Sequence, residues 1–265
     1  MISVVTTTFN THDWVLARTW ASLKAQTHTD WEWVIWDDST TDDVWRQVYG
    51  FCADERYRIR LHKSHTHSGS IGDVKRKGFM VAEGDILVEL DHDDELTPDC
   101  LRKVQDAFDS NPDAGFVYSD WCEILPDGNS GKYPDGWAFG YGSEYWSDQY
   151  GVWVMSAPPL NPVTVRHIVS APNHVRCWKA DLYHRIGGHN AELPIADDYE
   201  LFVRTYLETK CVHIPELLYK QYIGAHTAQR KKNDLIQRLV GEIATKYDDL
   251  LPSKTSGKTD VPDLE

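Results

Sequence analysis

The sequence predicts an α/β domain in which helices flank a mostly parallel, Rossmann-like central sheet. Over the first 120 residues, short apolar or β-branched runs alternate with segments of helical periodicity, an order typical of parallel sheets. The run Ile86 to Val88 is continuously apolar, as strands covered on both faces tend to be. With 265 residues, the chain has the length of one large domain or two small ones.

Each element of the first half follows from its own pattern. Runs rich in β-branched or aromatic residues predict strands, and apolar residues spaced by three and four predict helices. Strands are expected at 2–6, 31–36, 57–61, 85–90 and 115–118. Helices are expected between them at 14–26, up to about 50, at 71–81 and at 98–111, the last with Pro98 at its start.

The second half is less regular. Residues 126–162 are rich in Gly, Pro, Trp and Tyr without clean periodicity, which predicts a long functional loop or a small excursion packed by its own aromatic side chains. Helices are expected at 179–186, 197–208 and 228–247, and strands at 212–214 and 217–222. The polar tail, residues 251–265, is expected to be frayed.

Charge and composition exclude several classes of partner. The net charge of −14 argues against nucleic acid or an anionic membrane as the main partner, because both select basic surfaces. No run approaches the roughly 20 apolar residues of a membrane span, so only peripheral membrane association is compatible. The N-terminus lacks a signal-peptide pattern, and the five scattered cysteines form no CxxC pair. These features are typical of a cytoplasmic protein with reduced thiols.

A cluster of carboxylates follows the fourth expected strand, at Asp91, Asp93, Asp94 and Glu95. Like charges this close repel one another, so a doubly positive ion is expected among them. Ligands of parallel sheets bind beyond the carboxyl ends of the strands, where the motifs at 7–10 and 37–39 also fall. The alternative is a solvated acidic turn that caps the helix at Pro98.

Several motifs together resemble the family-two glycosyltransferases of the GT-A fold. In order and spacing they are TTTFN, SLKAQT, WEWVIWDDST and GDILVELDHDDELTPDCL, followed later by RCWKADLYHRIGGHNAELPIADDYELFVR and YIGAHTAQR. The resemblance implies a donor-binding half at 1–120 and an acceptor-binding, catalytic half at 121–250 of one domain. It implies a metal-dependent, inverting transferase that moves a sugar from a nucleotide-diphosphate donor, expected to be a UDP-sugar, to a saccharide or other hydroxyl acceptor.

The resemblance also implies roles on the donor side. Mn²⁺ or Mg²⁺ would stabilise the diphosphate leaving group, since both suit hard oxygen ligands. The implied metal ligands are Asp93, Asp91 and His226, although a lone histidine is as often structural. The implied nucleotide-sugar contacts are Thr7, Asn10, Asp38, Arg76, Asp91 and His92. Asp38 would accept a hydrogen bond from the base, whereas Asp37 is expected to form an Asx turn or helix cap. Arg76 is equally compatible with a surface position.

Inversion requires a base on the face opposite the leaving group. The resemblance assigns this role to Asp198, with Asp197 orienting the acceptor; the alternative for the pair is plain helix capping. Sugars stack their C–H faces on aromatic rings, so an acceptor platform is expected among the aromatic residues of the irregular segment. Packing of that segment by its own rings is the competing explanation. The candidate platform consists of Trp137, Tyr145, Trp146 and Trp153.

Two other functions compete with a glycosyltransferase. A non-catalytic carbohydrate-binding protein could share the fold, but the presence of both acidic motifs argues against it. A metal-dependent nucleotidyltransferase is expected to carry a glycine-rich phosphate loop near its N-terminus, and TTTFN contains no glycine.

Overall fold

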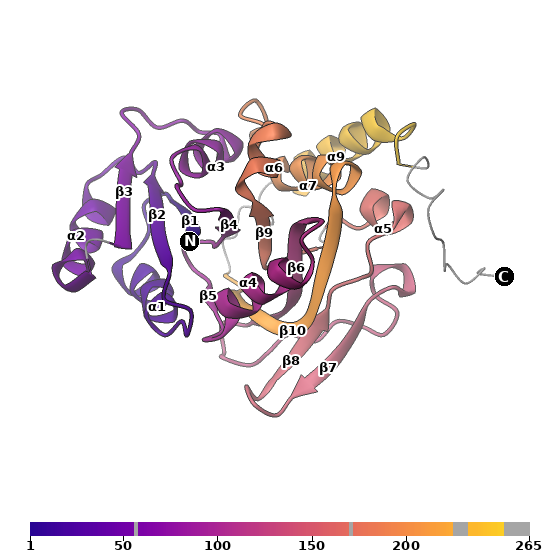
Figure 1. Cartoon of the computed structure of the whole chain (residues 1–265), viewed down its shortest axis with the longest axis horizontal. Helices are drawn as coiled ribbons and strands as arrows, with labels where there is room; N and C mark the ends of the chain where they lie inside the picture. Colours follow the sequence, from indigo (N-terminus) through magenta and orange to yellow (C-terminus); the bar gives the residue numbers. More distant parts are fainter. Residues whose placement is uncertain (56–57, 170–171, 225–232, 252–265) are drawn as a thin grey trace.

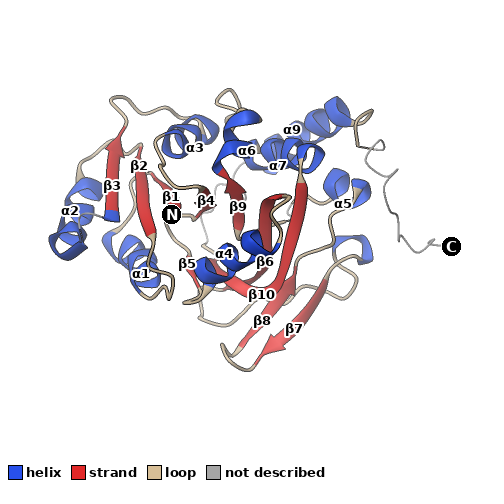
Figure 2. Cartoon of the chain, in the orientation of Figure 1, coloured by secondary structure: helices blue, strands red, loops and turns tan. Residues whose placement is uncertain are grey.

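A mostly parallel sheet of ten strands runs through the part of the chain that the structure, a computed structural model, describes: residues 1–55, 58–169, 172–224 and 233–251 (Figure 1). Its strand order is β3-β2-β1-β4-β9-β6-β10-β5, and a hairpin, β7–β8, is attached to β6. Figure 2 shows the strands running through the molecule with helices around them. This arrangement confirms the predicted α/β class.

The first half folds as the periodicity predicts. Its parallel strands are β1 (Ile2–Thr8), β2 (Trp31–Asp37), β3 (Ile59–Lys63) and β4 (Ile86–Glu89). Its helices are α1 (Asp13–Lys24), α2 (Asp43–Glu55), α3 (Ile71–Met80) and α4 (Cys100–Ser110). The apolar stripe of α4 is buried as expected, through Leu101, Val104 and Phe108.

Two strands, one expected in each half, are longer than predicted. The strand β6 (Ala114–Ile124) continues past residue 118, because its residues stay buried as far as Cys122. The two short strands expected at 212–214 and 217–222 are one strand, β10 (Lys210–Tyr222), paired in parallel with β6. Its register shifts between Ile214 and Leu217, where Pro215 has no backbone N–H to donate. The apparent break in the sequence is therefore an irregularity within a single strand.

The strand β9 (Arg176–Lys179) was missed in the sequence, and the helix expected at 179–186 begins directly after it. The strand lies antiparallel between β4 and β6. Four residues, two of them basic, give too short a pattern to predict a central strand. Further helices of this half are α6 (Ala180–Arg185), α7 (Asp197–Glu208) and α9 (Asn233–Tyr247). The bounds of α7 are those predicted. The predicted start of the last helix, at 228, lies outside the described residues.

The segment expected to be an irregular loop contains regular structure. Its hairpin pairs β7 (Ser143–Ser147) with β8 (Val152–Ser156), and β8 contacts β6 where Met155 faces Trp121. Val152 and Val154 are buried, whereas β7 is largely exposed. A short turn, η2 (Ala138–Gly140), precedes the hairpin, and α5 (Pro162–His167) and the two-residue strand β5 (Glu95–Leu96) complete the described elements.

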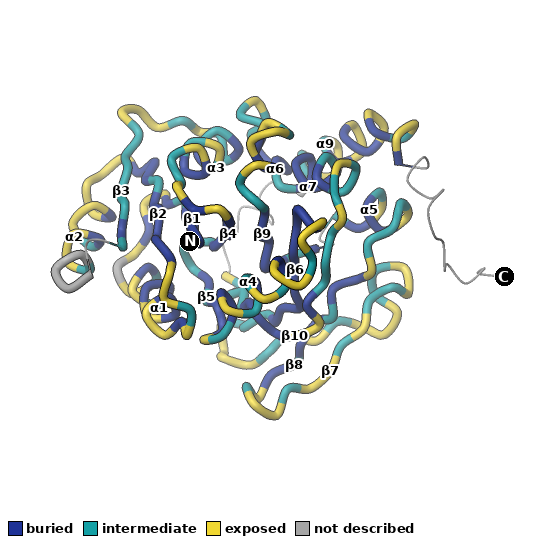
Figure 3. The backbone as a smooth tube through the Cα atoms, viewed as in Figure 1, coloured by how far each residue is buried: buried dark blue, intermediate teal, exposed yellow. Residues whose placement is uncertain are grey.

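The core lies along the central strands, which are the most deeply buried part of the tube in Figure 3. Trp20 stacks on Trp33 at 5.6 Å, and Trp178 packs between Phe79 and Phe116. Figure 1 shows α6, α7 and α9 grouped on the side where α3 lies, with the hairpin on the opposite side. Within the described ranges, no helix is long and apolar enough to cross a membrane.

Replacing Trp178 with alanine tests how far the fold depends on β9. Trp178 is 1% exposed and donates a hydrogen bond to the Thr205 hydroxyl at 2.9 Å. The expected loss is about 3–5 kcal/mol in the free energy of unfolding, since a buried indole leaves a cavity. Urea unfolding measures it. Trp146→Ala is the control, because that ring is 48% exposed and should cost less than about 1 kcal/mol. Equal losses in the two variants would contradict the central place of β9.

Candidate active site

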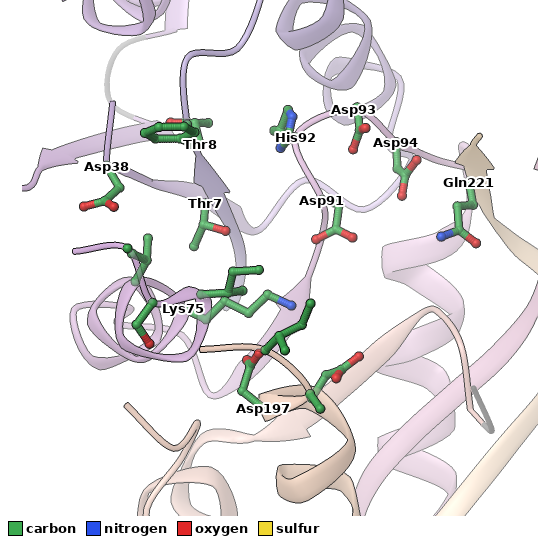
Figure 4. A pocket seen from close by; sticks show the side chains of 18 of the residues that line it. Thr7, Thr8, Asp38, Lys75, Asp91, His92, Asp93, Asp94, Asp197 and Gln221 are labelled. Atoms are coloured by element: carbon green, nitrogen blue, oxygen red, sulfur yellow. The ribbon is translucent and has the colours of Figure 1, made fainter. Parts of the chain in front are cut away.

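A cavity of about 1050 Å³ opens at the carboxyl ends of the parallel strands (Figure 4). Thr7 and Thr8 end β1, Asp38 follows β2, and the acidic segment 91–94 follows β4. The first turns of α3 and α7 and the end of β10 complete the wall. The motifs of both halves therefore meet in one space, as the topology predicts.

Asp38 occupies one corner of this cavity and is only 3% exposed. Its carboxylate accepts hydrogen bonds from the Ser68 backbone at 3.0 and 3.1 Å, and its Oδ2 lies 2.7 Å from His67 Nδ1. The His67 ring stacks on Phe9, which is 48% exposed at the cavity wall, with ring centroids 4.5 Å apart. The corner thus combines an exposed aromatic face with a carboxylate that the protein itself already holds.

Two polar residues beside this corner shape its loop. Asp37 accepts hydrogen bonds from the Thr8 hydroxyl and the Ser39 backbone N–H, both at 3.0 Å, which is the predicted Asx turn. Asn10 donates its backbone N–H to the Ser39 hydroxyl at 2.8 Å and accepts from Thr40. Asn10 therefore supports the loop and is not one of the residues that line the cavity.

Asp91, Asp94 and His174 bring a carboxylate oxygen each and an imidazole nitrogen within 4.8 Å of one another. His174 is 4% exposed, and its Nε2 lies 3.7 Å from Asp91 Oδ2. Asp93 and His92 line the same cavity but lie outside this group. Two carboxylates and an imidazole form a donor set that suits Mn²⁺, which accepts both oxygen and nitrogen ligands.

Asp94 is held in place from the far end of the chain. The Tyr219 hydroxyl donates to its Oδ2 and the Tyr222 backbone N–H to its Oδ1, both at 2.7 Å. The Tyr219 oxygen also accepts from the Asp91 backbone N–H at 3.1 Å. Burial, with Asp93 and Asp91 adding to it, raises the pKa of Asp94 well above its ordinary value. The acidic cluster therefore depends on β10 for its shape.

A buried network of charges lies below the cavity floor. Glu89, 2% exposed, pairs with Lys75 of α3 and lies 3.6 Å from the Arg176 guanidinium of β9. Arg176 in turn donates to Asp198 at 3.0 Å. Burial opposes charge on Glu89, but Lys75 and Arg176 outweigh it and lower its pKa below the ordinary value. In Figure 4, Lys75 reaches into the space between Asp91 and Asp197.

The carboxylates that open α7 differ in environment. Asp198 is exposed over 32% of its side chain, and Arg176 and Lys75 outweigh burial to lower its pKa. Asp197 is 2% exposed, and burial raises its pKa to about 7 in spite of Lys75. Both line the cavity. At neutral pH the exposed carboxylate is ionised, whereas the buried one is close to its titration midpoint.

The structure places some predicted residues elsewhere. Arg76 does not line the cavity; it donates to the carbonyl oxygens of Gly187 at 2.7 Å and His189 at 3.4 Å. Successive helical residues differ by about 100°, so Lys75, one residue earlier, is the basic side chain that faces the cavity. His226 lies outside the described residues.

The aromatic residues of the irregular segment also lie outside the cavity wall. Trp137 packs edge-on against Trp121 and donates to Glu144 at 3.2 Å, so it packs the segment as the competing explanation held. Tyr145 and Trp146 are 38% and 48% exposed on β7. Trp146 meets Trp153 of β8 at 5.6 Å. The hairpin therefore presents aromatic rings to solvent outside the cavity wall.

Sequence reasoning missed four polar residues of the site: Lys75, Glu89, His174 and Arg176. A signal existed for Glu89, because a carboxylate inside an apolar strand must find a buried cation. Its partners, Lys75 and Arg176, lie in other elements, and the sequence alone does not show that these elements meet.

This fold is that of the GT-A glycosyltransferases, and the cavity lies where such a sheet binds its ligands. The family model described as "Glycosyl transferase family 2" matches residues 3–146, and the chain belongs to this family.

Curated relatives extend beyond the chain. It is 29% identical over 229 residues to the O-antigen biosynthesis protein RfbC of Myxococcus xanthus, covering 85% of this chain and 16% of that protein. It is 24% identical over 235 residues to the chondroitin synthase of Escherichia coli, covering 89% of this chain and 31% of the synthase. The chain thus spans less than a third of the length of these two relatives.

Solved structures share the fold at low identity. S. aureus TarS 1–349 in complex with UDP-GlcNAc superposes with a TM-score of 0.69 at 16% identity, over 95% of this chain and 70% of that one. The mannosyltransferase PcManGT from Pyrobaculum calidifontis, in complex with GDP-Man and Mn²⁺, gives a TM-score of 0.65 at 16% identity, over 96% of this chain and 68% of that one.

Removing the charge of Glu89 tests the buried network. Glu89→Gln keeps the shape but leaves Lys75 and Arg176 without their shared carboxylate, and we expect a loss of about 3–5 kcal/mol in the free energy of unfolding. Glu83→Gln is the control; its pair with Arg60 is at the surface, 68% exposed on the Glu83 side, and is worth at most about 1 kcal/mol. Urea unfolding measures both, and a loss at Glu89 no larger than at Glu83 would contradict the role of the network.

Proposed function

We propose that this chain is a metal-dependent, inverting glycosyltransferase domain that moves a sugar from a UDP-sugar to a hydroxyl group of a glycan. One observation carries the proposal: a single cavity joins the acidic group at the end of β4 to the carboxylate pair at the start of α7. The donor phosphates and the attacking hydroxyl need these two kinds of group on opposite sides of the transferred sugar.

The donor nucleotide is proposed to lie between the end of β1 and the corner at Asp38. Phe9 offers a ring face to the base, and Thr7 lies on the wall beside it. Because the carboxylate of Asp38 already binds Ser68 and His67, its proposed contact with the base uses a remaining lone pair. Lys75 supplies the positive charge toward the phosphates that the sequence assigned to Arg76.

A divalent cation fits the donor set of Asp91, Asp94 and His174, and Mn²⁺ suits its mixed oxygen and nitrogen ligands better than Mg²⁺. When bound, such an ion stabilises the negative charge that develops on the diphosphate. The ligands that the sequence implied were Asp93, Asp91 and His226, of which Asp91 belongs to this set. The support for including His174 is that its imidazole is buried and its Nε2 lies 3.7 Å from Asp91 Oδ2.

Asp198 is the proposed base. Arg176 fixes its Oδ2 and keeps the carboxylate ionised, while a third of the side chain stays accessible from the cavity. The base removes the proton from the acceptor hydroxyl as the oxygen attacks the anomeric carbon. The proposed role of Asp197, deeper in the wall, is to orient that hydroxyl.

The acceptor is proposed to be a saccharide long enough to contact the hairpin. Trp146, which is 48% exposed, presents a ring that suits sugar C–H faces outside the cavity wall, and Trp153 packs against its edge. The names of the curated relatives, an O-antigen biosynthesis protein and a chondroitin synthase, support a glycan acceptor. A cytoplasmic location is proposed as well, supported by the buried free thiols of Cys100, Cys122 and Cys177.

A panel of nucleotide sugars, incubated with Mn²⁺ and a set of oligosaccharides, tests the proposal as a whole. Mass spectrometry should detect acceptors that have gained one sugar. Donor hydrolysis without transfer still indicates a catalytic site, whereas binding of sugars with neither reaction would favour the non-catalytic alternative.

We expect UDP to bind tightly only with a divalent cation, because the acidic group repels a bare diphosphate. Calorimetry with Mn²⁺ and with EDTA measures this, and Asp91→Asn and His174→Gln should each weaken binding in Mn²⁺ by at least about tenfold. Asp106→Asn, an exposed change on α4, is the control. Equal affinity in EDTA would remove the metal from the proposal. Loss of binding in Asp93→Asn but not in His174→Gln would place the cation at Asp93.

Asp198→Asn should lower kcat by about 10²–10⁴-fold, because the amide cannot take the proton. UDP affinity should hardly change, and the exposed change Asp181→Asn should leave kcat intact. Since the pKa of Asp198 is lowered, kcat of the unaltered enzyme should stay level between about pH 6 and 8. A half-maximal kcat near pH 7 would instead make Asp197 the base. Proton NMR of the product should show an inverted anomeric configuration, and retention would rule out this mechanism.

A further inference from the structure

His189 lies behind the carboxylate pair and has no part in the mechanism above. Its imidazole is fully buried, and its Nε2 lies 3.9 Å from Oδ2 of Asp197. Neither of these two atoms has a hydrogen-bond partner among the described residues. A buried polar atom without a partner is costly, so two of them facing each other across one short gap indicate a contact that the site uses.

The ring of His189 is held in one orientation. Its Nδ1 lies 2.7 Å from the Tyr183 hydroxyl, and its own backbone N–H donates to that hydroxyl oxygen at 3.1 Å. With its oxygen accepting from the backbone, the Tyr183 hydroxyl can donate its proton to Nδ1. The ring proton then sits on Nε2, the nitrogen that faces Asp197. Phe79 and Trp178 pack around the imidazole and restrict its rotation.

The loop that carries His189 is clamped from two sides. Arg76 donates to the carbonyl oxygens of Gly187 and His189, and Arg204 donates to those of Ile186 and Gly188. Gly188 has a φ of 65°, and a Cβ there would come within 2.7 Å of the Tyr183 ring. The loop can therefore bring His189 close to Tyr183 and Asp197 only with glycine at this position.

We infer that His189 is a positioning residue whose Nε2–H holds the carboxylate of Asp197 in the orientation that receives the acceptor hydroxyl. This inference rests on the proposed function, in which Asp197 orients the acceptor. This series of side-chain contacts runs from Tyr183 through the imidazole of His189 to Asp197, which lines the cavity. Arg76 was predicted to contact the nucleotide, but it supports the loop that carries His189 instead.

Burial and the surrounding charges keep the imidazole neutral and leave the Asp197 carboxyl close to its titration midpoint at pH 7. The groups that face this pair are Lys75 from α3, Glu89 from β4, Arg176 from β9 and Asp198 from α7. Burial lowers the pKa of His189 to about 3, so the ring is neutral at pH 7. Burial raises the pKa of Asp197 to about 7. An Nε2–H group that faces the ionised carboxylate stabilises it, so removal of this donor should raise the pKa of Asp197 further.

The kinetic test compares His189→Phe, which keeps a ring but has no donor, with His189→Gln, which can present an amide N–H. His189→Phe should raise the acceptor KM by about tenfold and move the acidic limb of kcat/KM for the acceptor to higher pH. His189→Gln should restore most of both. Calorimetry should show unchanged UDP affinity in either variant. A KM and a pH limb in His189→Phe equal to those of the unaltered enzyme would overturn the inference while leaving the proposed function intact.

A second measurement needs no activity. NMR of the full chain labelled with ¹⁵N-histidine reports which ring nitrogen of His189 carries the proton. The expected form has the proton on Nε2, with a shifted Nε2–H resonance in Asp197→Asn. A proton on Nδ1, or a resonance indifferent to Asp197→Asn, would overturn the inference even if the chain transfers sugar. Absence of transfer from every nucleotide sugar, with the expected NMR result, would overturn the proposed function and the acceptor role but not the hydrogen bond.

Discussion

The buried contact of Glu89 with Lys75 and Arg176 is the constraint on which the rest of the site depends. Isolated, any one of these charges would destabilise the core by several kcal/mol. Together they join α3, β4 and β9, and they do so directly below the cavity. Arg176 then has a second partner in Asp198, so the start of α7 is fixed to the same network. The geometry of the proposed base is thus a consequence of how the sheet neutralises its own buried charges.

The antiparallel strand β9 makes this possible. Its register places Arg176 opposite Glu89, and its other residues fill the core between β4 and β6. A parallel sheet brings the carboxyl ends of its strands to one edge, but it supplies few cations there by itself. The short antiparallel strand β9 places the guanidinium of Arg176 at that edge. Arg176 comes 87 positions after Glu89 in the sequence, since 176 − 89 = 87. The proposed donor and acceptor sides share a wall for this reason.

Much of this could be predicted from the sequence, and the failures have physical causes. The strands of the first half and the bounds of α7 follow from periodicity, and the turn at Asp37 follows from side-chain chemistry. Arg76 was expected to line the cavity, but Lys75 lines it instead. Neighbouring residues on a helix point about 100° apart, so an error of one residue selects a different helix face. The strand β9 and the histidines 174 and 189 were missed, since their partners are remote in sequence. The hairpin was missed because its exposed aromatic residues mask a weak alternation.

The hydrogen bonds from Tyr219 and Tyr222 to Asp94 determine when the acidic cluster can take its final shape during protein synthesis. The acidic residues are made before β10, yet two of the contacts that fix Asp94 come from Tyr219 and Tyr222 near the end of that strand, more than 120 positions later. A nascent chain that has folded its first four strands therefore carries the carboxylates without the hydroxyl and amide that arrange them. A ligand that needs these carboxylates in the arranged form can therefore bind only after β10 has been made.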